Sequence, residues 1–113
     1  DAARVGSSGE AVYAACKGGL VAFSKTIARE HARHNITVNV VCPGPTDTAL
    51  LAGVTAGAAN PEKLTEAFTK AIPMGRLGQP EDLAGAITFM SSDDAAFITG
   101  QVLSVSGGLT MNG

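Results

Sequence analysis

The sequence contains little charge, few cysteines and no long apolar run. Charged residues make up 16% of the 113 residues and the net charge is −2, so neither nucleic acid nor an anionic membrane is an expected partner. With 45% hydrophobic residues, the chain is too apolar and too weakly charged for a disordered segment. No apolar run approaches the roughly 20 residues that span a bilayer. These features predict a globular protein that does not cross a membrane.

The two cysteines, Cys16 and Cys42, are too few for a disulfide framework, and we therefore expect a reducing, cytoplasmic setting. His31 and His34 have a helical spacing, but neither cysteine belongs to a paired ligand motif. Histidines are also favourable near the end of a helix, where cations suit the dipole. We predict no metal site and expect Cys16 to be a small core residue.

A long helix is predicted from about Glu10 to His34. Asn35 follows at a position where a helix often ends in a left-handed residue. A β-rich run, Ile36–Val41, comes next and ends at Cys42-Pro43-Gly44-Pro45. Apolar residues at three- and four-residue steps predict the buried stripe of the helix: Val12, Cys16, Leu20, Phe23 and Ile27.

Two further helices and a strand are predicted downstream. Asn60-Pro61-Glu62 combines a capping side chain, a first-turn proline and an acid, and this helix should run to about Ile72. Pro80-Glu81-Asp82 opens the next helix, and Val102–Val105 is a second strand. Ala49–Ala59 is interpreted as a mobile loop of small residues. The expected inner side of the second helix is Leu83, Ala86, Ile87 and Met90.

The order helix, strand, two helices, strand indicates crossover units of an α/β protein. Two parallel strands alone do not make a stable sheet, because each exposes an unpaired edge and an apolar face. Ile36–Val41 needs neighbours on both sides. We therefore expect residues 1–113 to be part of a larger layered domain.

Tyr13 and Lys17 stand four residues apart on the first helix, so their side chains project from one face. A phenol with a reference pKa of about 10 is a poor base at neutral pH. A nearby ammonium lowers that pKa and makes the phenol a usable proton shuttle. On spacing alone, however, a helical tyrosine beside a surface lysine is the simpler interpretation.

The sequence motifs around Tyr13 and Lys17 favour the catalytic interpretation of the pair. In the order of the chain, the motifs are Val12–Leu20, Ile36–Gly44 with Thr46-Asp47-Thr48, Met74–Asp82 and Ile98–Val102. Together they resemble the C-terminal half of a short-chain dehydrogenase/reductase, matched along the whole chain. Within that family the sequence most resembles 2-hydroxycyclohexanecarboxyl-CoA dehydrogenases, and next 3-oxoacyl carrier-protein reductases. The resemblance implies an α/β fold, here the C-terminal part of a Rossmann-like doubly wound parallel sheet.

The resemblance also implies roles for individual residues. Tyr13 would be the general acid/base, and Lys17 would hold the nicotinamide ribose hydroxyls while lowering the tyrosine pKa. The Pro43-Gly44 turn would lie beside the nicotinamide. The backbone of Thr46 and the hydroxyl of Thr48 would meet its carboxamide. This agrees with the sequence order, since open α/β sheets bind ligands at the carboxyl ends of their strands.

Several family features are absent from these 113 residues. Counted back from Tyr13, the serine that binds the reacting oxygen falls just before Asp1. Ser7 is too close to Tyr13 for that role; it either lines the substrate pocket or belongs to a turn beside Gly6 and Gly9. The dinucleotide loop and the residue that selects the cofactor are also missing, so NAD is expected and NADP stays open.

The expected activity is the NAD(P)-dependent interconversion of a secondary alcohol and a ketone through the Tyr-Lys pair. The expected substrate is an acyl thioester, an alicyclic 2-hydroxyacyl-CoA oxidised to its 2-oxo form, with 3-oxoacyl carrier-protein reduction as the alternative. The resemblance implies a homo-oligomer, a tetramer or a dimer, formed by the full-length protein. A different class of function is an inactive fragment that contributes only an oligomer interface. The 113 residues alone are expected to be inactive.

Overall fold

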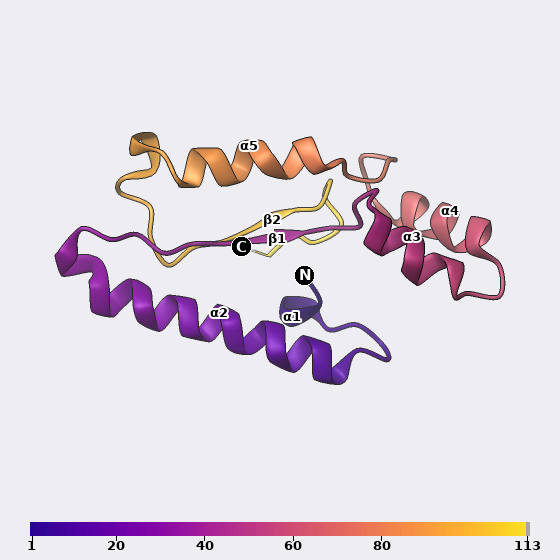
Figure 1. The fold of residues 1–113 in the computed structure, drawn as a ribbon, viewed down its shortest axis with the longest axis horizontal. Helices are drawn as coiled ribbons and strands as arrows, with labels where there is room; N and C mark the ends of the chain where they lie inside the picture. The colour runs from indigo at the N-terminus through magenta and orange to yellow at the C-terminus, as the bar shows by residue number, and fades with distance from the viewer. Residues whose placement is uncertain (113) are drawn as a thin grey trace.

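The computed structural model describes residues 1–112 (Figure 1). Two strands and five α-helices follow one another, with two short 3-10 turns at residues 32–34 and 93–95. A short first helix that the sequence analysis did not predict precedes the long one. The elements are α1 (Ala2–Val5), α2 (Ala11–His31), β1 (Val40–Pro43), α3 (Ala49–Ala56), α4 (Pro61–Ala71), α5 (Pro80–Met90) and β2 (Val102–Val105).

The two strands form a parallel sheet in which Val40 lies opposite Val102 and Pro43 opposite Val105. Figure 1 shows α2 along one side of this sheet and α5 along the other. The chain passes from β1 to β2 through α3, α4 and α5, which is the crossover connection that parallel strands require. The predicted α/β class, with part of a Rossmann-like parallel sheet, is confirmed.

Helix α2 begins and ends close to the predicted residues. It continues through the 3-10 turn to His34 and stops at Asn35, whose φ of 59° and ψ of 33° are left-handed. The Asn35 N–H donates to the Ala32 carbonyl at 3.0 Å. Asparagine tolerates this conformation, so the predicted stop signal is confirmed.

The first strand begins later than predicted, at Val40 instead of Ile36. Before that point, one backbone hydrogen bond, from the Gly100 N–H to the Val38 carbonyl at 2.8 Å, is joined by side-chain contacts. The Val38 N–H donates to Thr99 Oγ1 at 3.0 Å, and the Asn39 amide donates to the Ile98 carbonyl at 2.9 Å while accepting from the Gln101 N–H at 3.0 Å. Asn39 is a structural hydrogen-bonding residue whose side chain helps to fix the register of β1 with β2.

The loop predicted over Ala49–Ala59 is wrong, because most of it is the helix α3. Thr48 caps this helix: its Oγ1 accepts from the Leu51 N–H at 3.3 Å. Alanine and leucine are strong helix formers. The many small residues of the segment led to its interpretation as a loop. Helices α4 and α5 begin at the predicted prolines, and the Asn60 side chain caps α4 as expected, accepting from the Lys63 N–H at 3.1 Å.

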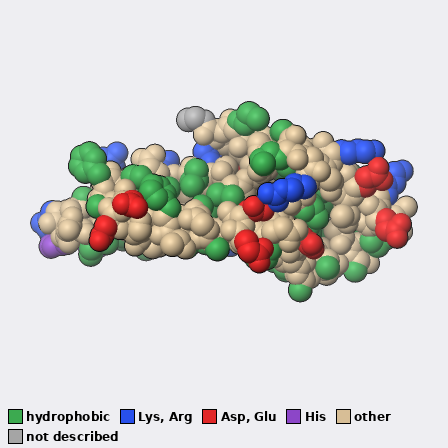
Figure 2. Space-filling view, turned by 90° about the horizontal axis from the view of Figure 1, so that it is seen from above, with side chains coloured by type: hydrophobic (Ala, Val, Ile, Leu, Met, Phe, Trp, Pro, Cys, Tyr) green, Lys and Arg blue, Asp and Glu red, His purple; other side chains and the backbone are tan. Residues whose placement is uncertain are grey.

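Few side chains are buried. Among the described residues, the buried apolar side chains are those of Ala28, Cys42, Ile72 and Ala95, and no large side chain is fully buried. The radius of gyration is 15.7 Å, whereas a compact chain of this length has about 13 Å. Figure 2 shows hydrophobic side chains spread over the visible surface. Among the described residues, no helix is long and apolar enough to cross a membrane.

The stripe predicted to be the buried side of α2 is largely on the outside. Val12 is 78% exposed, Phe23 is 62% exposed and Cys16 is an exposed thiol, so the prediction of Cys16 as a core residue is wrong. The less exposed side of α2 instead carries small residues such as Gly18 and Ala28. Small residues let a helix approach its neighbours closely: a Cβ on Gly18 would lie 3.9 Å from the Ala3 carbonyl. The side of α5 predicted to be buried is only partly covered: Leu83, Ala86 and Met90 are half-buried, and Ile87 is 51% exposed.

Candidate active site

Tyr13 and Lys17 lie in the first turns of α2, one turn apart on the same side. The Lys17 Nζ is 5.6 Å from the centroid of the Tyr13 ring, a distance at which an ammonium is attracted to an aromatic face. Tyr13 is 53% exposed and Lys17 is also exposed, so both functional groups are accessible. The helix therefore brings a phenol and a positive charge together, as the spacing predicts.

The turn that leads into α2 contains Ser7. Gly6 and Gly9 on either side have φ values of 78° and 82°, and the Glu10 N–H donates to the Ser7 carbonyl at 3.2 Å. Ser7 is exposed in this turn. The geometry explains its position as a turn residue, and its role towards substrate stays a prediction.

The carboxyl ends of β1 and β2 meet at Gly44. Gly44 directly follows the last residue of β1, and its N–H donates at 2.9 Å to the carbonyl of Val105, the last residue of β2. A Cβ on Gly44 would lie 2.7 Å from Ser106 Cα, closer than side-chain carbons come to backbone. Gly44 is therefore required for the close approach of the two chains, and Ser106 is buried against it.

The next residues form a loop built on short-range hydrogen bonds. The Thr46 hydroxyl donates to the Gly44 carbonyl at 2.9 Å. The Thr48 hydroxyl donates to the Thr46 carbonyl at 3.3 Å and accepts from Leu51 at the start of α3. Since a hydroxyl accepts two hydrogen bonds, one acceptor site of Thr48 is left for a ligand. The structure thus places Pro43, Gly44, Thr46 and Thr48 in one segment at the strand ends.

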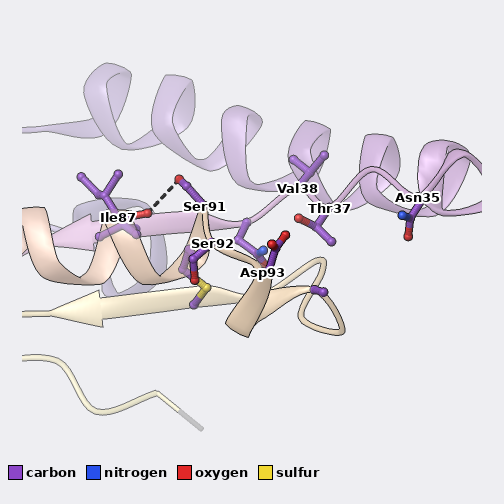
Figure 3. A pocket seen from close by; sticks show the side chains of 11 residues that line it. Asn35, Thr37, Val38, Ile87, Ser91, Ser92 and Asp93 are labelled. Carbon is purple, nitrogen blue, oxygen red and sulfur yellow. Dashed lines mark hydrogen bonds between the residues drawn. The ribbon is translucent and has the colours of Figure 1, made fainter.

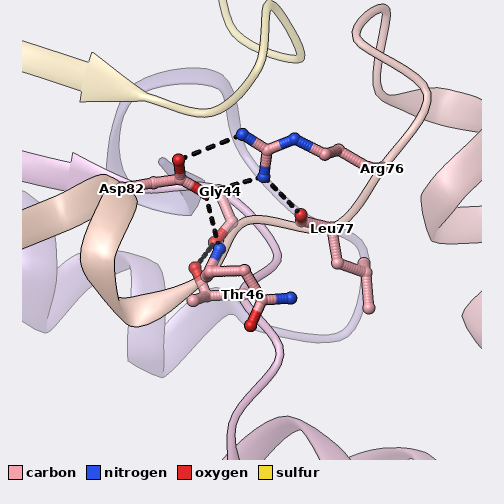
Figure 4. Close-up of polar contacts among 6 residues, drawn as sticks. Gly44, Thr46, Arg76, Leu77 and Asp82 are labelled. Atoms are coloured by element: carbon pink, nitrogen blue, oxygen red, sulfur yellow. Dashed lines mark hydrogen bonds and ion pairs between the residues drawn. The ribbon is translucent and has the colours of Figure 1, made fainter.

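A second segment, which the sequence analysis cited as a motif without assigning roles, clamps this loop. The Gly78 N–H donates to the Pro45 carbonyl at 2.9 Å, and the Asp47 N–H donates to the Gly78 carbonyl at 2.8 Å. Arg76 and Asp82 then form a bidentate ion pair beside the clamp, with distances of 2.7 and 3.0 Å (Figure 4). Arg76 and Asp82 are six residues apart, which is not a helical spacing. The only sequence signals for this ion pair were the basic residue before Gly78 and the acid at the start of α5.

The ion pair changes the titration of both partners. The Arg76 guanidinium, together with the Gln79 N–H, lowers the pKa of the Asp82 carboxyl to about 2. The hydrogen bond and charge of Asp82 raise the pKa of Arg76. The Asp82 carboxylate also accepts from the Gln79 N–H at 2.7 Å, which completes a capping box at the start of α5. One carboxylate therefore ties the clamp to a helix.

The amino end of α2 and the carboxyl end of β1 lie at the same end of the molecule, on the right in Figure 1. The predicted pair and the predicted loop therefore share one end of the fold. Within residues 1–112, no hydrogen bond joins Tyr13 or Lys17 to the loop. A small cavity of 130 Å³ lies among Pro45, Arg76 and Ser106 at this end.

A second, larger hollow lies elsewhere. An open space of 740 Å³ lies between the approach to β1 and the carboxyl end of α5, where Val38, Ile87 and Ser92 face it (Figure 3). None of the residues predicted for the site lines it. It borders the edge of β1 that β2 does not cover, so unpaired sheet accounts for its size.

The described residues hold no group of three or more His, Cys, Asp or Glu side chains suited to a metal ion. His31 and His34 do lie together, with ring centroids 6.1 Å apart. Cys16 and Cys42 are both free thiols, the first exposed and the second buried. Among the described residues, the two histidines and two cysteines do not form one cluster.

Comparison with known proteins completes the description of the site. The profile of the family described as Enoyl-(Acyl carrier protein) reductase matches residues 1–110. The chain belongs to the short-chain dehydrogenase/reductase family.

Curated members of the short-chain dehydrogenase/reductase family are similar along nearly the whole chain. A 3-oxoacyl-(acyl-carrier-protein) reductase FabG of Escherichia coli is 42% identical over 95% of this chain and 41% of its own length. The FabG of Chlamydia muridarum is 41% identical over 92% of this chain and 40% of its own. A human (3R)-3-hydroxyacyl-CoA dehydrogenase is 42% identical over 96% and 39%. The chain thus spans about two fifths of the length of these relatives.

The predicted resemblance to 3-oxoacyl carrier-protein reductases is confirmed by these relatives. The resemblance to 2-hydroxycyclohexanecarboxyl-CoA dehydrogenases stays a prediction.

Proposed function

We propose that this chain is part of an NAD(P)-dependent oxidoreductase that interconverts a secondary alcohol and a ketone. The observation that carries the proposal is the Tyr13–Lys17 pair, with an ammonium 5.6 Å from the phenol ring at the end of the fold where both strands finish. That end is where open α/β sheets bind ligands. Membership of the short-chain dehydrogenase/reductase family supports the same chemistry.

We propose that residues 1–113 form the carboxyl-terminal portion of a single domain. The relatives are matched over about two fifths of their length. The two-stranded sheet leaves an edge of β1 unpaired, and the side chains buried among the described residues are few. The remainder of such a domain would pair that edge and supply the dinucleotide loop and the serine.

Tyr13 would move the proton. During oxidation its phenol oxygen takes the proton of the substrate hydroxyl, and during reduction it returns one to the carbonyl oxygen. Lys17 would hold the ribose hydroxyls and place a positive charge beside the phenol. A bound nicotinamide supplies or accepts the hydride that balances each proton transfer. NAD is the expected cofactor, and NADP fits the same residues.

The residues after β1 fit the nicotinamide end of such a cofactor. Gly44 lacks a side chain where the chain is most crowded, so backbone lies close to the strand ends. Thr48 keeps one acceptor site, which suits the amide N–H of a carboxamide. Pro43 would form the wall of the turn, and the backbone of Thr46 would complete the contact. These four roles are supported by their shared position.

The substrate we propose is an acyl thioester with a hydroxyl or keto group on its acyl chain. The resemblance of the sequence to 2-hydroxycyclohexanecarboxyl-CoA dehydrogenases favours an alicyclic 2-hydroxyacyl-CoA. The names of the relatives favour a second candidate, a 3-oxoacyl or 3-hydroxyacyl thioester. Turnover of one and not the other by the full-length protein would separate the two.

We also propose that the full-length protein is a homo-oligomer, a dimer or tetramer, which associates through α2. The support is the row of exposed apolar side chains on this helix, including Leu20 and Phe23. The two free thiols suit a reducing cytoplasm, where we expect the protein to work.

The test is Tyr13→Phe in the full-length protein. Removing the hydroxyl should lower kcat by about 10²–10⁴-fold, because that is the usual contribution of a positioned proton donor. Cofactor affinity should change little, since the ring and Lys17 are retained. Thr26→Ala on the same helix, which removes only a local hydroxyl contact, serves as the control. Turnover like the wild type in Tyr13→Phe would overturn the assignment.

A further inference from the structure

The Arg76–Asp82 ion pair is a bidentate polar contact near the site that the proposed reaction does not use, formed by side chains that are 52% and 35% exposed. Its two hydrogen bonds measure 2.7 and 3.0 Å. The Arg76 guanidinium also donates to the Leu77 carbonyl at 3.0 Å. The segment between the partners is therefore closed into a ring by side chains at both ends. Figure 4 shows the carboxylate and the guanidinium facing each other above this ring.

The ring carries the contact that holds the loop after β1. Gly78, inside the ring, exchanges backbone hydrogen bonds with Pro45 and Asp47 at 2.9 and 2.8 Å. It also lies against Thr46, since a Cβ on Gly78 would be 3.3 Å from Thr46 Oγ1. Thr46 in turn donates to the Gly44 carbonyl. The ion pair is therefore connected to the strand ends through the backbone of Gly78 and the hydrogen bonds of the loop that Gly78 contacts.

Outside the ring, two backbone hydrogen bonds hold the start of the segment from Met74 to Gln79. The Met74 N–H donates to the Gly107 carbonyl at 3.1 Å and the Gly75 N–H to the Ile72 carbonyl at 2.8 Å. Met74 is 67% exposed, and Gly75 has a φ of 71° and no side chain. With so little apolar packing, the backbone of this segment depends on its polar contacts. A bidentate arginine–carboxylate pair imposes both distance and orientation, which a single-point contact does not. The pair is well suited to set the position of Gly78.

We propose that Arg76 and Asp82 are positioning residues that hold the Pro43–Thr48 loop in place for the nicotinamide end of the cofactor. The proposal rests on the proposed function. Neither residue touches the reacting atoms; both act through Gly78 and Thr46. Loss of the pair should loosen the loop and spare the part of the cofactor that this chain does not hold.

The test compares two ligands in the full-length protein carrying Arg76→Ala. The first is the complete dinucleotide, and the second is ADP-ribose or its 2′-phosphate, which lacks the nicotinamide. The dissociation constant for the dinucleotide should rise about tenfold, and kcat should fall by up to about a hundredfold, because small misplacements near reacting atoms cost this much. The dissociation constant for ADP-ribose should stay within about twofold, a result that general loss of structure does not produce.

Two further variants sharpen the comparison. Asp82→Asn keeps the size of the side chain and removes the charge, and it replaces Arg76→Ala as the test if that variant does not fold. Glu66→Gln breaks the exposed ion pair with Lys70 on α4, which is 2.9 Å long and includes no residue of the loop or of the Met74–Gln79 segment, and should leave both affinities unchanged. Arg76→Lys retains the charge but not the fork, and should fall between the wild type and alanine.

Equal weakening of both ligands in Arg76→Ala, or no change in either, would overturn the positioning role. A wild-type protein that binds neither ligand would overturn the proposed function itself, and the positioning role with it. The two failures are therefore distinguishable in one titration series.

Discussion

At the residue scale, the end of the sheet depends on the absence of one side chain. The space beside Gly44 is filled by Ser106, whose Cα and Cβ would lie 2.7 and 2.8 Å from an added methyl group. One of these atoms is backbone and cannot rotate away. The strand ends and the loop after them would have to separate to admit any other residue.

Gly44→Ala should therefore lower the free energy of unfolding of the full-length protein by about 1–3 kcal/mol, the usual cost of overpacking. Gly85→Ala is the matched control. A Cβ at Gly85 meets nothing within 4 Å, and in a helix interior the change should stabilise by about 0.5–1 kcal/mol. Denaturant unfolding measures both. A Gly44→Ala protein as stable as the wild type would contradict the crowding.

Residues of the site differed in how far the sequence predicted them. Tyr13 and Lys17 are neighbours in a helix, so their spacing alone determines that they meet. The Pro43–Thr48 loop is located by the strand before it. Arg76 and Asp82 meet only because the chain between them turns back at a helix start, and a residue count does not describe such a turn. A pairing of this kind can be predicted only from the folded backbone.

At the element scale, the starts of α4 and α5 and both limits of β2 were predictable, whereas α3 and the start of β1 were not. Asn60, Pro61 and Pro80 mark helix starts through local chemistry, and each is where the structure begins a helix or its cap. The start of β1 depends on Asn39, whose partners lie 59 and 62 positions away. Helix α3 was missed because small residues suit both a loop and a helix.

The start of α5 should be sensitive to acid. Asp82 has its pKa lowered from 3.8 to about 2, by Arg76 first and then by the Gln79 N–H. Its contribution to stability is therefore present above about pH 4 and is lost as the pH falls towards about 2. The difference in Tm between the wild type and Asp82→Asn should shrink over that range. Asp94→Asn, which removes an exposed carboxyl elsewhere, is the control, and parallel curves for Asp82→Asn and the wild type would contradict the prediction.

At the scale of the whole molecule, the apolar residues of α2 face outwards. The periodicity correctly detected an apolar face but assigned it to the core, because a sequence pattern does not say which surface a face meets. The sheet side of the helix is lined by small residues. An exposed stripe of large apolar groups on a soluble protein commonly marks an interface.

Phe23→Glu should therefore reduce the assembly size of the full-length protein, because a charge at an apolar interface loses its hydration without gaining a partner. Light scattering coupled to size exclusion measures the mass. Ala67→Glu on α4 adds the same charge away from α2 and should leave the mass unchanged. An unchanged mass in Phe23→Glu would place any interface elsewhere.

The parallel pairing of β1 with β2 also has a consequence for synthesis of the chain. The hydrogen bond from the Gln101 N–H to Asn39, which fixes the register at the start of β1, can form only after Gln101, 62 positions later, has been synthesised. At about 5–20 residues per second on a ribosome, this delay lasts roughly 3–12 seconds. During this time the emerging strand has no β2 beside it, although the residues of α3, α4 and α5 have been synthesised. Unpaired strand edges favour aggregation, so in the interval between its two strands the nascent protein should be prone to aggregate and to bind chaperones.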